Sequence, residues 1–221
     1  MPVAGTIPPQ RAVVKARVQR IAWLMGQDGA RGIEEVECIV AAAGRSARMG
    51  DWKPALAFGD ATIIETVVAS ALGACPRVIL VTGYRGRELA AFFHGEPRVV
   101  PIENPDWPLG MFSSIRCGVA HVRTGRFFVS LGDMPWIRPA LYTALMQSPP
   151  IDAVFPVFGG RSGHPVLFSQ KVKRKVLSAD PETGSMKDIT SRLEVSELAW
   201  GDDSILRDID TLEDYRPPSG V

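Results

Sequence analysis

Short apolar runs and helix-like stretches alternate along the chain from residue 36 onward. The apolar runs have the length of buried strands, and they lie at 36–42, 77–82, 98–102, 126–131, 153–157 and 165–169. Helical spacing of apolar residues predicts helices at 62–72, 87–93, 111–122 and 139–147. Strands that are apolar on both faces need cover on both faces. We therefore predict an α/β fold of three layers, with a mostly parallel, Rossmann-like sheet between two layers of helices.

The first 35 residues follow a different pattern. Apolar residues from Val14 to Met25 are spaced by 4, 3 and 4, which predicts a helix that three glycines then end. We divide the chain into an N-terminal helical extension, 1–35, and a single domain, 36–221. The extension is expected to pack on the domain or on a partner, and a basic membrane-surface helix is the alternative.

Composition narrows the class of protein. The chain has 221 residues, 46% of them hydrophobic, and a formal net charge of +1. This composition favours a globular domain and gives no general surface for nucleic acid. Three scattered cysteines form no metal-binding pattern and are expected to be buried thiols in a reducing compartment. Apolar runs stay well below the ~18 residues of a membrane span, and basic residues interrupt any signal-peptide core, so we predict a cytoplasmic protein without membrane contact.

The loop after the first strand carries the clearest candidate chemistry. Gly44 permits a sharp turn with free backbone N–H groups, and Arg48 and Lys53 add positive charges nearby. Ligands bind beyond the carboxyl ends of strands in such a sheet, so this loop could hold a triphosphate. The loop has neither a Walker A motif nor a dinucleotide fingerprint, and an ordinary turn would explain the glycine and cations alone.

Two later loops also follow predicted strands. Ser113 and Ser114 lie at a helix start, where hydroxyls and free amides could read the edge of a base; the alternative is an ordinary N-cap by Ser113 with Trp107 as packing. Asp133 follows the fourth strand beside a glycine, which suits an Mg²⁺ ligand. Asp208 and Asp210 should alternate on a strand and point the same way.

The string AAAGRSARMGDWK, residues 41–53, resembles the LAAGxSxRMGxxK signature of the MobA-like nucleotidyltransferases. Ala43 makes it most similar to the molybdenum cofactor cytidylyltransferases, since guanylyltransferases usually carry Gly there. Further segments resemble family motifs: VTGYR at 81–85, NPDWPLGMFSS at 104–114, GDMP at 132–135, GRSGHPV at 160–166 and DIDTLEDY at 208–215. The resemblance covers residues 36 to 216. It departs at Gly184, where Ser185 replaces an acidic residue and leaves pterin contacts there open.

The resemblance implies roles for these residues. Arg48, Lys53 and Asp133 are expected to be catalytic, Asp133 and Asp210 to bind Mg²⁺, and Gly163 and His164 to border the second substrate. The expected nucleotide-binding residues are Ala42, Ala43, Gly44, Arg45, Ser46, Arg48, Lys53, Thr82, Gly83, Asn104, Gly110, Ser113 and Ser114.

The implied activity is CTP:molybdenum cofactor cytidylyltransfer. A phosphate of the molybdopterin-type acceptor attacks the α-phosphorus of CTP, and pyrophosphate leaves. A molybdoenzyme or its chaperone is a further expected partner. Two alternatives stay open: transfer to a sugar or polyol phosphate by the same fold, or non-catalytic delivery of cofactor to a molybdoenzyme.

Overall fold

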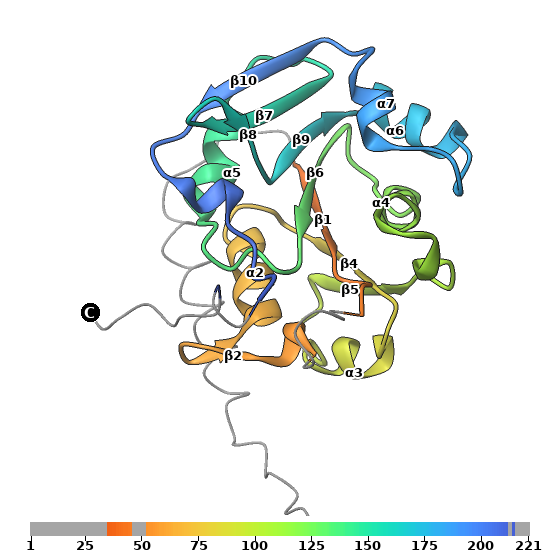
Figure 1. Ribbon diagram of the computed structural model, residues 1–221, viewed down its shortest axis with the longest axis vertical. Coiled ribbons are helices and arrows are strands. Elements are labelled where there is room, and N and C mark those ends of the chain that lie inside the picture. The colour runs from red at the N-terminus through yellow and green to blue at the C-terminus, as the bar shows by residue number, and fades with distance from the viewer. Residues whose placement is uncertain (1–34, 46–51, 212–213, 215–221) are drawn as a thin grey trace, which may run out of the picture.

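The computed structural model describes residues 35–45, 52–211 and 214, which build one eight-stranded sheet and a small hairpin. In spatial order the path of the sheet is β10 (Val195–Ala199), β7 (Ala153–Phe158), β9 (Val166–Ser169), β6 (Arg126–Leu131), β1 (Glu37–Ala41), β4 (Val78–Thr82) and β5 (Val99–Glu103) (Figure 1). The short β8 (Arg161–Ser162) pairs with β7. The hairpin is β2 (Ala57–Phe58) with β3 (Ala61–Thr62).

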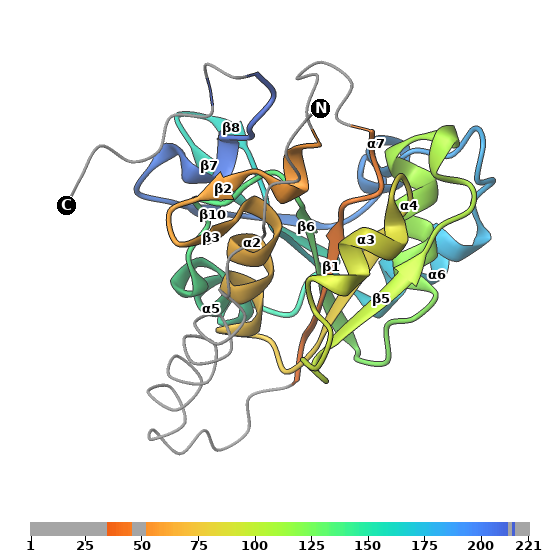
Figure 2. The same ribbon diagram turned by 90° about the horizontal axis from the view of Figure 1, so that it is seen from below.

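Helices cover both faces of this sheet, as the sequence predicts. On one face lie α2 (Ile63–Leu72), α3 (Gly86–Ala91) and α5 (Pro139–Met146), whose apolar side chains form one core cluster with the strands. On the other face α4 (Met111–Val119), α6 (Gln170–Ser178) and α7 (Met186–Thr190) contribute to a second cluster. Figure 2 shows α2 and α5 on the opposite side of β1 from α4 and α6. The three-layer α/β prediction is therefore confirmed.

Parallel pairing brings several strand ends to one edge. Strand β1 runs parallel to β4 and β6, with Ala41 opposite Val81 and Leu131. Since these three strands end in register, the loops that follow them meet at the same edge. Two strands interrupt the parallel order: β9 is antiparallel to both of its neighbours, β6 and β7, and the short β8 is antiparallel to β7.

Some elements differ from the sequence prediction. Strand β10 and helix α6 were not predicted, because their apolar residues alternate with many polar ones and only one side is covered. Asp208 and Asp210 were expected to alternate on a strand, which is wrong: residues 207–210 form no strand or helix. The helix expected within the first 34 residues lies outside the described part of the chain. Within the described ranges, no helix combines the length and apolar character needed to cross a membrane.

The thiols mostly follow expectation. Cys38 and Cys75 are buried, whereas Cys117 is only half-buried, and none of the three forms a disulfide among the described residues.

Candidate active site

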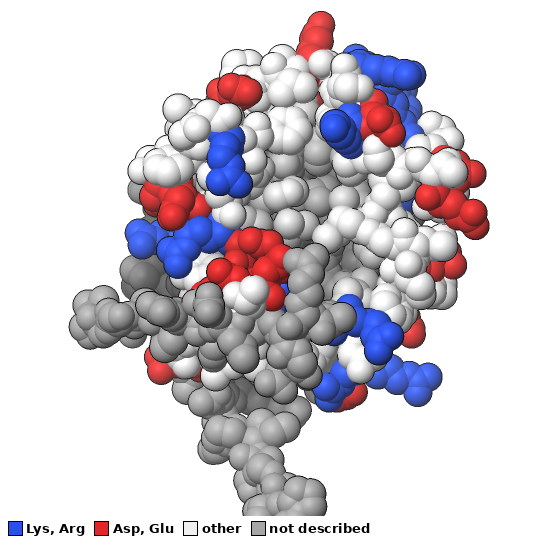
Figure 3. Space-filling view, in the orientation of Figure 1, with Lys and Arg blue, Asp and Glu red and all other residues white. Residues whose placement is uncertain are grey.

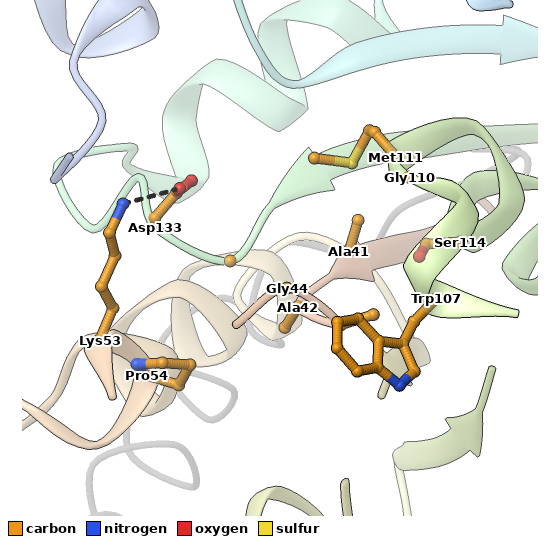
Figure 4. A pocket seen from close by; sticks show the side chains of 12 residues that line it. Ala41, Ala42, Gly44, Lys53, Pro54, Trp107, Gly110, Met111, Ser114 and Asp133 are labelled. Atoms are coloured by element: carbon orange, nitrogen blue, oxygen red, sulfur yellow. Dashed lines mark ion pairs between the residues drawn. The ribbon is translucent and has the colours of Figure 1, made fainter. Parts of the chain in front are cut away.

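A pocket opens at the edge where β1, β4 and β6 end. Its volume is about 200 Å³ (Figure 4). The lining residues come from the loop after β1, from the 3-10 turn η1 (Lys53–Ala55), from the start of α4 with the turn before it, and from the loop after β6: Ala41, Ala42, Ala43, Gly44, Lys53, Pro54, Trp107, Gly110, Met111, Ser114, Gly132 and Asp133. The pocket thus lies where ligands bind in α/β sheets.

Backbone hydrogen bonds hold the loop after β1 in place. The Gly132 N–H donates to the Ala41 carbonyl at 2.9 Å, and the Tyr84 N–H donates to the Ala43 carbonyl at 3.0 Å. A Cβ at Gly132 would lie 2.8 Å from the Cβ of Ala42, so only glycine allows this close approach. The expected residues Ala42, Ala43 and Gly44 therefore line the pocket on a fixed backbone.

Lys53 and Asp133 form the charged wall of the pocket, and two further aspartates, Asp208 and Asp210, lie close to Asp133. The Lys53 Nζ lies 2.7 Å from an Asp210 oxygen and 3.9 Å from an Asp133 oxygen, and the residue is only 7% exposed. Carboxylate oxygens of Asp133, Asp208 and Asp210 lie within 4.8 Å of one another. In Figure 3 acidic side chains gather at one rim of the central hollow. Asp133 and Asp210 thus share one close, buried lysine.

Burial and like charge raise the pKa of Asp133. Desolvation is the largest cause, Lys53 opposes it, and the charges of Asp208 and Asp210 add to it. A carboxylate cluster whose negative charge is incompletely balanced suits a divalent cation, because hard cations prefer oxygen ligands. Asp133, Asp208 and Asp210 are therefore the residues that could hold a metal.

Residues 208–210 are held beside Asp133 by one backbone hydrogen bond and one buried side chain, both from Ile209. The Ile209 N–H donates to the Asp133 carbonyl at 3.0 Å. The Ile209 side chain is fully buried against Ile63. This anchor places the aspartates on either side of Ile209 beside Asp133. Only Asp210 was expected as a metal ligand, although the alternation of Asp208 with Asp210 in the sequence already indicated that both could face Asp133.

The buried amide of Asn104 organises the start of α4. Its Nδ2 donates to the hydroxyl oxygens of Ser113 and Ser114 at 3.0 and 3.1 Å. The Ser113 hydroxyl in turn donates to the carbonyl oxygens of Asp106 and Gly110. Gly110, with φ of 106°, occupies the N-cap position, so the alternative of an N-cap by Ser113 is wrong. Only Gly110 and Ser114 of this group line the pocket.

The β4 loop supports an aromatic wall. A Cβ at Gly83 would lie 2.7 Å from Trp107, so the glycine allows the indole to approach. Tyr84 packs edge-on against Trp107 at 6.0 Å, and the Arg45 guanidinium lies 5.5 Å from the Tyr84 ring centre. Thr82 is buried beneath this loop.

The remaining expected site residues fall into two groups. Ser46 and Arg48 lie outside the described residues. Gly163 and His164 are not among the residues that line this pocket. His164 instead lines a second cavity, which meets the first at Met111.

Comparison with known proteins agrees with this geometry. Residues 38–196 match the model of the MobA-like NTP transferase domain. The chain is 33% identical over 180 residues to the molybdenum cofactor cytidylyltransferase of Escherichia coli, covering 81% of this chain and 93% of that protein.

Solved structures give the same result. The crystal structure of Rv0371c from Mycobacterium tuberculosis superposes with a TM-score of 0.70 and 28% identity, covering 82% of this chain and 96% of that one. The manganese complex of Rv0371c gives a TM-score of 0.67 and 26% identity over the same shares. The pocket at the sheet edge, the match over most of the chain and these relatives together show that the chain belongs to the MobA-like NTP transferase family and is a nucleotidyltransferase.

Proposed function

We propose that this protein transfers the cytidylyl group of CTP to a phosphate of a molybdopterin-type cofactor. The observation that carries the proposal is the pocket in which the glycine loop after β1 faces Lys53 and the aspartate cluster. The name of the Escherichia coli relative supports the choice of nucleotide and acceptor.

The reaction needs positioning and charge neutralisation rather than a general base. An oxygen of the acceptor phosphate, already an anion, forms the new bond to the α-phosphorus of CTP. The bond from that phosphorus to the bridging oxygen breaks, and the electron pair leaves with pyrophosphate. The site therefore has to hold two anionic substrates together and offset their charge.

The aspartate cluster fits a divalent cation, and we propose Mg²⁺ on Asp133 and Asp210 with Asp208 as a further ligand. A manganese complex is known for the related Rv0371c protein. When bound, the cation supplies charge neutralisation at the phosphates. Lys53 has a flexible stem, and its ammonium group lies at the pocket wall, from which it can turn from Asp210 to a β- or γ-phosphate.

The other nucleotide contacts follow from the lining. The backbone of Ala42, Ala43 and Gly44 would face the phosphates and sugar, and Gly110 and Ser114 would face the base. Arg45 would approach from its place over Tyr84. Ser46 and Arg48 are proposed as further phosphate ligands from the sequence resemblance. Thr82, Gly83, Asn104 and Ser113 would act indirectly, by holding the loops that line the pocket.

Pyrophosphate release tests the proposal. The purified protein should be given each of the four nucleoside triphosphates with Mg²⁺ and, in separate reactions, molybdopterin, a sugar phosphate or a polyol phosphate. We expect release with CTP and molybdopterin only, together with the cytosine dinucleotide of the cofactor. Release only with a sugar or polyol phosphate would overturn the assigned acceptor. Binding of cofactor without any turnover would favour a delivery protein instead.

A further inference from the structure

Two consecutive residues of the loop between β4 and α3, Tyr84 and Arg85, contact two points of the chain between β1 and η1. Tyr84 contacts the first point. Its N–H donates to the Ala43 carbonyl at 3.0 Å, and the guanidinium of Arg45 lies over its ring, 5.5 Å from the ring centre. A cation at this distance is attracted by the face of the ring. Tyr84 thus holds Arg45 beside the pocket-lining backbone of Gly44.

Arg85 contacts the second point, Trp52. Its guanidinium lies over the Trp52 ring, 4.3 Å from the ring centre, and its Nε donates to the Glu88 carboxylate at 2.8 Å. The Trp52 ring also packs against Phe92, with the ring centres 6.3 Å apart. The indole Nε1 makes no hydrogen bond with a described residue. Among the described residues, the Trp52 side chain is therefore held by ring stacking and apolar packing.

The two contacts use opposite partners. At the first point Arg45 supplies the cation and Tyr84 supplies the ring, whereas at the second point Trp52 supplies the ring and Arg85 supplies the cation. Tyr84 and Arg85 are neighbours in the sequence, so a displacement of this pair would shift both points together. We call the two residues the clamp.

The backbone of Arg85 is unfavourable for its residue type. Its φ of 54° and ψ of 35° lie in the left-handed region, and no other non-glycine residue that the structure describes has a positive φ. The Cβ of an L-residue is crowded in this conformation, which glycine adopts freely. Such residues persist where their surroundings hold them, often at functional sites. The contacts of its side chain therefore explain an arginine here better than the turn does.

Trp52 directly precedes the lysine of the pocket. The Trp52 carbonyl accepts a hydrogen bond from the Ala55 N–H at 3.1 Å, and the Lys53 carbonyl accepts one from the Leu56 N–H at 3.0 Å. These bonds form the turn η1, from which the Lys53 Nζ reaches Asp210 at 2.7 Å. A shift of the Trp52 ring would therefore move the Lys53 backbone and take the ammonium group from its place at the pocket.

We propose that Tyr84 and Arg85 are positioning residues, which hold Arg45 and Lys53 in place for the phosphates of a bound nucleoside triphosphate. Tyr84 acts through Arg45 itself, and Arg85 acts through Trp52. This inference rests on the proposed function, which gives Arg45 and Lys53 their contacts with the nucleotide. The clamp should therefore serve affinity for the β- and γ-phosphates rather than for the base.

The test compares the binding of CTP with that of CMP, which lacks these two phosphates. Both are titrated calorimetrically with Mg²⁺ into the wild type, Arg85→Gly, Trp52→Leu and the variant with both substitutions. Glycine relieves the left-handed backbone, and leucine keeps an apolar side chain without a ring. The matched control is Arg98→Ala, which removes another arginine–glutamate pair, with Glu96 at 3.1 Å, just before β5 and away from the pocket.

We expect Arg85→Gly and Trp52→Leu each to weaken CTP binding about tenfold, with CMP binding unchanged. The double variant should bind CTP about as weakly as either single variant, because both substitutions remove the same contact. Trp52→Phe, which keeps a ring for Arg85, should retain most of the CTP affinity. Arg98→Ala should bind both nucleotides like the wild type.

A second set of variants tests the other contact of the clamp. Tyr84→Leu should weaken CTP binding in the wild type but have no further effect on it in the Arg45→Ala background, because its cation partner is already absent there. A further loss of CTP affinity in that background would overturn the inference, since Tyr84 would then not act through Arg45.

Three other outcomes would overturn the inference. One is an equal loss of CTP and CMP affinity in Arg85→Gly, which would indicate a merely structural role. Another is unchanged CTP affinity in that variant, and the third is a wild type that binds CTP no more tightly than CMP. Arg85→Gly decides the matter if Trp52→Leu fails to fold. Failure of the proposed function appears separately, as absence of pyrophosphate release by the wild type with CTP and molybdopterin.

Discussion

Glu37 begins β1 at the amino edge of the sheet, whereas Asp133 follows β6 at the carboxyl edge. Glu37 is 3% exposed, and its carboxylate accepts hydrogen bonds from the Arg77 guanidinium and from the backbone N–H groups of Arg123 and Thr124. Asp133 has Lys53 at 3.9 Å and two other aspartates as neighbours.

The two carboxylates differ in pKa for this reason. Burial alone would raise the pKa of Glu37, but its hydrogen bonds and the charge of Arg77 together lower it. At Asp133 burial prevails over Lys53, and the pKa is raised. The negative charge of Glu37, which supports the fold, is thus balanced by hydrogen bonds and by Arg77. The negative charge of Asp133 is only partly balanced, so a cationic ligand can interact with it.

The largest effect should come from Asp133→Asn. We expect kcat/KM for CTP-dependent pyrophosphate release to fall about a thousandfold, because a metal ligand and its charge are lost. The free energy of unfolding at pH 7 should not fall, since a carboxylate with a raised pKa is ionised more easily in the unfolded chain. Full activity of the folded variant would contradict the metal assignment.

Lys53→Met should act almost as strongly on turnover. The long methionine side chain can retain packing of the stem, while loss of the ammonium group should reduce kcat about a hundredfold by removing a phosphate contact. Mn²⁺ affinity at pH 7.5, measured calorimetrically, should be no weaker, because Lys53 no longer competes for Asp210. A parallel loss of Mn²⁺ affinity would show that Lys53 mainly organises the aspartates.

Glu37→Gln should reduce stability and leave activity unchanged, the reverse of the effect expected for Asp133→Asn. We expect the free energy of unfolding in urea at pH 7 to fall by about 1–3 kcal/mol, because charged hydrogen bonds are lost, with kcat/KM unchanged. Since the folded-state pKa of Glu37 is lowered, its contribution is present above the unfolded value of about 4.3 and is lost as pH falls through the folded pKa. A Glu37→Gln variant that lost activity but kept its stability would contradict the structural role of Glu37.

The smallest effect is a change in pH dependence from Asp208→Asn. Protons compete with the metal for Asp133, so Mn²⁺ affinity should fall as pH falls through the raised pKa of that carboxyl. The charge of Asp208 raises the pKa of Asp133. The substitution should therefore move the pH at which Mn²⁺ affinity falls to a lower value. Affinity at pH 7.5 should drop about tenfold through loss of a ligand. A fall in Mn²⁺ affinity that began at higher pH in the variant would contradict the effect of Asp208 on the pKa of Asp133.

Much of the fold could be predicted from local pattern. The runs that became β1, β4 and β6 are apolar at nearly every position, as strands buried on both faces must be. Strand β10 was not predicted because its side chains alternate between exposed and half-buried. Helix α7 was not predicted because it has only five residues. Such elements gain their stability from neighbours rather than from their own sequence.

By itself the sequence determined the buried strands, the glycine loop after β1 and the aspartate that follows β6, because backbone demands and apolar burial are local. Only the tertiary structure decided that Lys53 meets Asp210, 157 residues away, and that Asp208 joins the cluster through the buried Ile209. It also separated Asn104 and Ser113, which hold a loop, from Ser114, which faces the pocket. Contacts between distant segments depend on how the whole core packs, and no local pattern carries that information.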